Sequence, residues 1–300
     1  MAGDLFLFVQ CELPWALGPP DGRYLLRSHT DGEPERVVVL GTVGAHRAER
    51  ARGSGPLRRR AAARRRPVAA QPEPAPVTTT RATIVDPVSV SAERQAQAWL
   101  ADLDAEREVA SAFAALNRVL HSQRIASADP YAREVAPAQA LAIRAGWGEG
   151  EQVAEGVWLH AVQLPWSAPR ERVRRRASVL RADERLAGLL AAREQPLLCE
   201  ELALRARLDL DQGRAAHAAL ELDRAYTAAL AELGDERRAD LPLRVDELRS
   251  LQPDVTAAAQ VALRSAAPAT DAAPEALDEA ALGHALGRLE ATLRARAAAG

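Results

Sequence analysis

A strongly basic run followed by a proline-rich stretch interrupts the first third of the chain. Residues 47–66 hold nine arginines and one acidic residue, Glu49, so this run carries a net charge of +8. Four prolines follow within residues 67–76. Proline has no backbone N–H and a fixed φ, so this stretch can neither continue a helix nor join a central strand. The sequence therefore predicts a disordered loop over residues 47–76.

The composition favours helices with thin cores. The chain has 300 residues, of which 48% are hydrophobic but only 4% aromatic. Much of the apolar fraction is alanine, which favours helices and buries little surface. This length has room for one large or two medium domains.

The absence of lysine excludes several classes of enzyme. All 39 basic residues are arginine. Walker-A phosphate loops, protein kinases, pyridoxal-phosphate enzymes and Ser-x-x-Lys acyl enzymes each need a lysine side chain. A GC-biased genome explains the arginine excess and the single asparagine, Asn117, so the excess alone does not indicate function.

The cysteine pattern predicts a reducing, cytoplasmic location. Cys11 and Cys199 lie in different halves, with no CxxC or Cys/His metal spacing, so we expect no disulfide framework, metal or cofactor. The apolar run at residues 5–9 lacks a basic flank and is too short for a signal peptide. No apolar stretch is long enough to predict a membrane span.

The N-terminal part predicts a small β-rich module over residues 1–46 plus 77–90. Runs of apolar and β-branched residues between turn signals predict strands at residues 4–11, 23–27, 35–43 and 77–85. We expect a mainly antiparallel sheet of three or four strands backed by a helix.

From Ser91 onward the pattern becomes helical. Helices are predicted from Ser91, from Asp129-Pro130 to Gly146, and near 150–164, 168–194, 196–212, 214–233, 240–252, 254–266 and 275–298. We therefore expect an α+β fold with an all-helical domain over 91–265, a linker over 266–274 and an amphipathic C-terminal helix over 275–300.

One helical segment resembles part of a tetratricopeptide repeat. The turn Asp211-Gln212-Gly213-Arg214, followed by Ala218 and Ala225, looks like the turn and second helix of such a repeat. The preceding helix lacks the expected Trp/Leu-Gly-Tyr spacing, and no second copy follows where a solenoid needs about three. We interpret the segment as an ordinary helical hairpin with a small-residue seam.

Residues 117–166 contain the least generic side chains, including three of the five tryptophans. Asn117, His121 and Arg124 fall on one helix face, which with the loop 144–151 predicts a polar cleft or docking groove. The alternative is a wet helix face with the tryptophans in the core. The candidate binding residues are Asn117, His121, Arg124, Asp129, Tyr131, Trp147 and Trp158.

Other motifs predict no catalytic or metal-binding residue. Gly146-x-Gly148-x-Gly150 follows a predicted helix and carries acidic residues, so we interpret it as a structural turn rather than a phosphate cradle. No Gly-x-Ser-x-Gly nucleophile turn and no His-Glu-x-x-His zinc motif lies in a suitable context.

The basic run supplies the candidate anion contacts, because arginines that neutralise phosphates release counterions. These contacts are Arg58, Arg59, Arg60, Arg64, Arg65 and Arg66. The run has no aromatic residue to stack on bases, and the rest of the chain is net −10. A solvated loop is therefore the favoured interpretation, and a second arginine cluster at 170–176 predicts an exposed helix face.

A leucine seam marks the last helix. Leu282, Leu286, Leu289 and Leu293 are spaced by four, three and four residues, so they pack either on their own domain or on a partner or second copy. The favoured function is a non-enzymatic protein-interaction or adaptor protein. The alternative is a nucleic-acid-associated protein that uses the Arg-rich loop, and the third hypothesis is an unrecognised enzyme with a polar site on the 117–133 helices.

Overall fold

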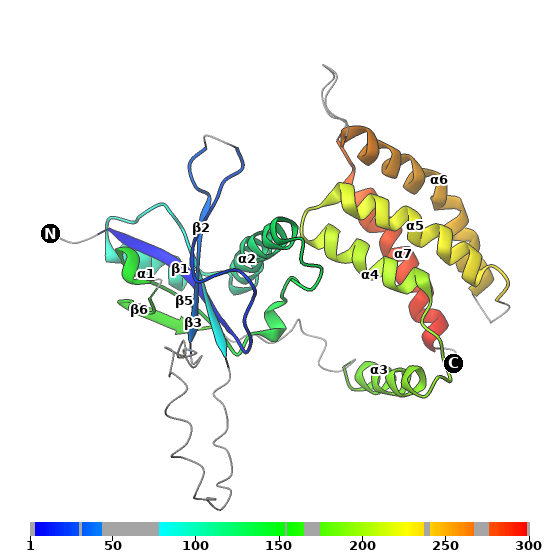
Figure 1. The fold of residues 1–300 in the computed structure, drawn as a ribbon, viewed down its shortest axis with the longest axis horizontal. Helices are drawn as coiled ribbons and strands as arrows, with labels where there is room; N and C mark the ends of the chain where they lie inside the picture. Colours follow the sequence, from blue (N-terminus) through cyan, green and yellow to red (C-terminus); the bar gives the residue numbers. More distant parts are fainter. Residues whose placement is uncertain are drawn as a thin grey trace, which may run out of the picture. The chain divides into compact units, whose positions relative to one another are not determined.

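The chain forms an α+β structure with two compact units, Met1–Pro169 and Arg170–Gly300 (Figure 1). The computed structural model describes residues 4–29, 32–43, 78–153, 155–164, 175–236, 241–266 and 276–298. The predicted loop at 47–76 and the predicted linker at 266–274 therefore lie outside the described residues, apart from Ala266. None of the helices in the described ranges is long and apolar enough to cross a membrane.

The first unit is built on a six-stranded antiparallel sheet. Its strands are β1 (Leu5–Leu13), β2 (Gly22–Leu26), β3 (Arg36–Val43), β4 (Thr79–Val85), β5 (Ala142–Glu149) and β6 (His160–Gln163). They lie in the order β2-β3-β4-β1-β5-β6, so the longest strand, β1, is central. The four predicted strands and the mainly antiparallel pairing are confirmed, but the sheet has six strands rather than the expected three or four.

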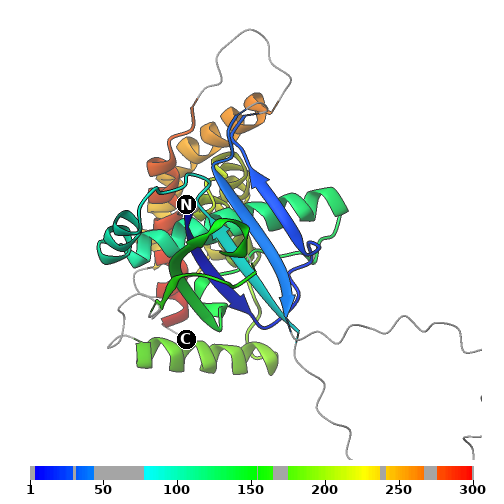
Figure 2. The same cartoon turned by 90° about the vertical axis from the view of Figure 1, so that its left-hand side faces the viewer.

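Two helices, α1 (Glu93–Ala101) and α2 (Ala105–Ser127), cover one face of the sheet (Figure 2). Alternate strand residues point to this face, and those nearest α2 include Val9, Cys11 and Val38. They pack against Phe113 and Leu116 of α2, and all five side chains are buried. We call this side the helix face.

The opposite side, which we call the outer face, carries cross-strand rows that differ in their content of apolar and polar residues. One row aligns Leu25, Val37, Val85, Phe8 and Gly146, and the next aligns Arg23, Val39, Thr83, Gln10, Arg144 and Gln163. A third row aligns Gly41, Arg81 and Glu12. The segment around Trp158 folds over part of this face, with its ring 5.8 Å from the ring of Phe8.

The predicted helices ending at Gly146 and spanning 150–164 are wrong. The structure has the short 3-10 helix η2 (Pro137–Gln139), strand β5, the 3-10 helix η3 (Gly150–Val153) and strand β6 in their place. Ile143 and Trp147 point to the helix face while Gly146 and Gly148 lie on the outer face, which is the two-residue period of a strand. Two strands therefore lie inside the range 91–265, which was expected to be all helical.

The glycine motif is also corrected, because its first two glycines lie inside β5 rather than in a turn. A Cβ atom at Gly146 would lie 2.1 Å from the backbone oxygen of His160, and one at Gly148 would lie 2.7 Å from Val153 Cγ2. These glycines let neighbouring segments approach the strand closely. Only Gly150, with φ of +52°, turns the chain.

The second unit is helical. Its helices are α3 (Arg175–Leu190), α4 (Leu198–Asp211), α5 (Ala215–Leu233), α6 (Leu241–Ser265) and α7 (Glu279–Ala298). Helices α4 to α7 surround one core, in which the buried Tyr226 hydroxyl donates to the backbone oxygen of Ala285 at 2.8 Å. The predicted hairpin is confirmed as α4 and α5, joined at Gly213 with φ of +69°.

Two further predictions for the second unit can be compared with the structure. Residues 240–252 and 254–266 were expected to form separate helices, but α6 is one helix with Pro253 inside it. Leu282, Leu286 and Leu289 are buried in the core of their own unit. The first of the two proposed roles for the leucine seam, packing on its own domain, therefore holds for these residues.

Candidate functional site

The polar face predicted on α2 contacts the segment that follows this helix in the sequence. The buried side chain of Asn117 donates to the Val135 backbone oxygen at 3.0 Å and accepts from the Val135 N–H at 2.8 Å. One turn later, His121 Nδ1 lies 3.4 Å from a carboxylate oxygen of Glu134, which is itself largely buried. Both residues therefore have a structural partner on the same segment.

Arg124, Asp129 and Tyr131 lie beyond this contact. Arg124 is exposed, and Tyr131 is 82% exposed. The Asp129 carboxylate accepts a hydrogen bond from the Tyr131 N–H at 2.9 Å, so it shapes the turn after α2. Neither these three side chains nor Asn117 lines any of the three hollows found among the described residues.

The two candidate tryptophans lie on opposite faces of the sheet. Trp147 is buried on the helix face, where its ring stacks on His160 at 4.6 Å. Trp158 covers Phe8 on the outer face. They cannot line one cleft together, and the binding role of all seven residues stays a prediction. The six candidate anion contacts between Arg58 and Arg66 lie outside the described residues.

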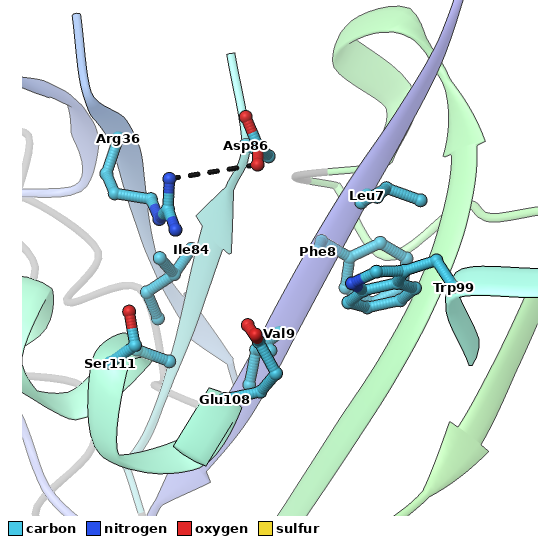
Figure 3. A pocket seen from close by; sticks show the side chains of 10 residues that line it. Leu7, Phe8, Val9, Arg36, Ile84, Asp86, Trp99, Glu108 and Ser111 are labelled. Carbon is cyan, nitrogen blue, oxygen red and sulfur yellow. Dashed lines mark ion pairs between the residues drawn. The ribbon is translucent and has the colours of Figure 1, made fainter. Parts of the chain in front are cut away.

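A small cavity of about 90 Å³ lies where α1 and α2 meet the sheet (Figure 3). Trp99, Ile84 and Val9 line it, and Glu108 and Ser111 of α2 lie at its edge. The Arg36 guanidinium also lines it and forms an ion pair with Asp86 at 3.7 Å. This volume holds a few water molecules, whereas ligand sites span roughly 300–1,000 Å³.

A groove of about 600 Å³ lies in the helical unit. It is lined by residues of α3, α4 and α7. Five leucines are among its lining residues: Leu186, Leu189, Leu197, Leu204 and Leu293. We call this the leucine groove.

Ion pairs line the rim of the leucine groove. Arg185 of α3 donates to Glu200 of α4 at 2.5 Å. On the α7 side, Glu290 accepts from Arg207 at 2.8 Å and lies 3.7 Å from Arg294. The rim therefore carries both signs of charge around an apolar floor, which is the usual anatomy of a protein-binding surface.

Helix α3 leaves much of its apolar surface exposed. Leu186 is 55% exposed on α3, and Leu204 is 68% exposed on the facing side of α4. An isolated helix of this length is marginal in water and depends on packing of its apolar face. A partner that fills the groove would bury both leucines and stabilise α3.

The leucine groove was missed by sequence reasoning, although α4 carries a signal for it. Leu202 and Ala206 face the core, while Leu204 and Leu208 lie on an exposed side of the same helix. A helix that packs on a single core needs only one apolar stripe, so packing on the core does not explain the leucines on the exposed side. Leucines on two faces of α4 thus indicate two contacts, one of them unpartnered within the described part of the chain.

No protein-family model, no curated protein and no solved structure matches this chain. Among the residues that the structure describes, no three His, Cys, Asp or Glu side chains are grouped to hold a metal ion. The leucine groove is a candidate binding site because of its volume and its apolar lining.

Proposed function

We propose that this chain is a protein-interaction protein whose helical unit binds an amphipathic helix of a partner. The observation that carries this proposal is the leucine groove, with its volume of about 600 Å³ and its exposed leucines on two facing helices. Partner helices enter such grooves with apolar side chains spaced at i, i+3 or i+4 and i+7.

The shape and lining support a helix over a small polar substrate. The groove is lined by leucine and alanine side chains from three helices, while its charged groups are paired with one another at the rim. The partner helix therefore needs an apolar stripe for the floor and charged residues of both signs along its edges. Such complementarity sets orientation more than affinity.

A displayed library of amphipathic helical peptides tests this function. Leucine is fixed at the i, i+4 and i+7 positions, the other positions are varied, and the full chain is the target. We expect peptides to be enriched, and the Leu204→Glu variant to bind them at least about tenfold more weakly, because a charge then lies on the groove wall.

Leu243→Glu is the matched control. Leu243 is 75% exposed on α6 and does not line the groove. Peptides that bind wild type and Leu243→Glu equally, but not Leu204→Glu, support the proposal. If no peptide is enriched, or if the selected peptides bind Leu204→Glu as tightly as wild type, the proposed function is wrong.

A further inference from the structure

Gly41 lies inside strand β3 although no steric reason requires a glycine there. It lies in β3 with regular pairing to Arg81, and its φ is not in the left-handed region. A Cβ atom at this position would meet no atom of the described residues within 4 Å. Glycine in a strand interior is destabilising, and it often marks a place where a ligand approaches the backbone.

Because Gly41 has no side chain, its backbone lines a hollow of about 360 Å³ on the outer face of the sheet. We call it the Gly41 hollow. Val39 and Val43 flank the glycine along β3, and Arg23 of β2 and Arg81 of β4 stand on either side. The volume lies within the range of small-ligand sites.

Arg81 is only loosely held by the protein. Its Nη1 atom lies 3.4 Å from the Glu155 backbone oxygen, and its Nη2 atom lies 3.7 Å from Glu12. Its Nε atom is buried without a hydrogen-bond acceptor in the described part of the chain. Glu12 makes its shorter contact, at 2.9 Å, with Arg144. One carboxylate is thus shared by two guanidinium groups, and the cationic charge at Arg81 is only partly compensated.

Two acidic residues, Asp21 and Glu155, line the hollow. Asp21 accepts from the Thr42 N–H at 2.9 Å and from the Thr42 hydroxyl at 2.7 Å, so both of its oxygens have donors. Glu155 contacts Arg81 through its backbone carbonyl, and the residue is exposed. The hydrogen bonds of Asp21 do not remove its charge, so the carboxylates of Asp21 and Glu155 both oppose an anion here, and the cations at the hollow that offset them are Arg81 and Arg23.

We propose that the Gly41 hollow binds a small oxyanion, a carboxylate or phosphate group, which lies over Gly41 and accepts hydrogen bonds from Arg81. A guanidinium matches both groups in a bidentate manner. When the ligand binds, Arg81 replaces its long contacts with Glu12 and Glu155 by shorter hydrogen bonds to the ligand. The space left by the absent side chain at Gly41 accommodates the ligand. This site is in the first unit and is independent of the leucine groove.

Titration of the full chain with inorganic phosphate and, separately, with succinate tests the site. The readout is the arginine Nε–Hε NMR resonance that disappears in Arg81→Gln. We expect a saturable shift of this resonance with at least one of the two anions. Which anion binds more tightly tells a phosphate ligand from a carboxylate ligand.

Gly41→Val separates binding from folding. Valine suits a strand and meets open space, so the variant folds with unchanged or increased stability while its side chain fills the hollow. The arginine run at 47–66 is present in both proteins, so its own anion binding cancels in the comparison. We expect Gly41→Val to lose the saturable shift of the Arg81 resonance.

Glu155→Gln gives the opposite change, because it removes a like charge from the edge of the hollow, and we expect tighter binding. The proposal is overturned if neither anion shifts the Arg81 resonance in a saturable manner. It is equally overturned if a folded Gly41→Val protein binds as wild type does.

Discussion

At the scale of single residues, Asn117 shows how one polar side chain organises a loop. It is 2% exposed, and its amide satisfies both the N–H and the C=O of Val135. We expect Asn117→Ala to lower the free energy of unfolding by roughly 2–4 kcal/mol, because two buried backbone groups then lack partners. Urea unfolding followed by tryptophan fluorescence measures this change, since all five tryptophans lie in the first unit.

Arg124→Ala is the control for this substitution. Arg124 lies two turns further along α2 and is exposed, so its removal should change the unfolding free energy by less than about 0.5 kcal/mol. Equal effects of the two substitutions would contradict the role assigned to Asn117.

The two cysteines are protected by burial. Burial, with a smaller effect of Glu12, raises the pKa of the Cys11 thiol to about 12. Burial likewise raises the pKa of Cys199, and Glu232 adds to the effect through its hydrogen bond and its charge. Since the thiolate is the reactive form, neither cysteine should react readily at pH 8.

A thiol reagent such as Ellman's reagent checks this expectation. The folded protein should react slowly at pH 8, and both thiols should react rapidly once urea unfolds the chain. A Cys199→Ser variant assigns the remaining signal to Cys11. A fast reaction of either thiol in the folded state at pH 8 would show that its burial is less complete than described.

At the scale of elements, α4 takes its N-terminal cap from a different helix. Leu197 stands at the N-cap position and has no side-chain acceptor. Glu232 of α5 instead accepts from the N–H groups of Leu198 at 2.9 Å and Cys199 at 3.0 Å. These are two of the first-turn donors that a helix cannot satisfy itself.

The acidic cap gives the second unit a pH dependence with a definite sign. Burial alone raises the pKa of Glu232, but the hydrogen bonds from the backbone and thiol of Cys199 and the N–H of Leu198, with the charge of Arg296, outweigh burial and hold this pKa below its ordinary value. A depressed pKa in the folded state means that the stabilisation is present above the unfolded value and is lost as the pH falls through the folded value.

Glu232→Gln tests the cap. We expect it to destabilise the second unit by about 1 kcal/mol near pH 7, and the difference from wild type to shrink as the pH falls below 4.5. Urea unfolding by far-UV circular dichroism measures it, while tryptophan fluorescence reports the first unit and should not change. A difference that is constant from pH 7 to pH 3 would contradict the electrostatic part of the cap.

Sequence periodicity predicts elements well where one face is apolar and fails where both faces are covered. The strand around Val38 and the helices α4 and α5 follow from local patterns. Strand β5 does not, because Gly146 and Gly148 serve contacts with His160 and Val153 that only the folded chain shows. Pro253 likewise predicts a helix end, but the surrounding packing retains one continuous α6.

At the scale of the whole molecule, the sequence predicts the two hydrophobic cores but not the hollows at the surface. The helix-face core around Val38 and Phe113 and the helical core around Tyr226 belong to different units. Their existence follows from composition and pattern. The leucine groove does not, because it depends on how Leu186 of α3 and Leu204 of α4 lie relative to Leu293 of α7, a helix far from both in the sequence. The Gly41 hollow depends in the same way on strand register.

Charge asymmetry is a property of the whole chain, and it leads to the last prediction. Residues 47–66 carry +8 against −10 for the remainder. If this run binds nucleic acid, the affinity must fall steeply with salt, with a slope of roughly −0.9 in log–log form for each phosphate contacted on duplex DNA. Replacing the run by a glycine-serine linker of equal length keeps the length of the chain and removes the charge. We expect the linker variant to lose the salt-dependent binding to duplex DNA, measured from low to physiological salt by fluorescence anisotropy. Equal binding by both proteins, or no binding by the wild type near physiological salt, would leave the run without a role in nucleic-acid recognition.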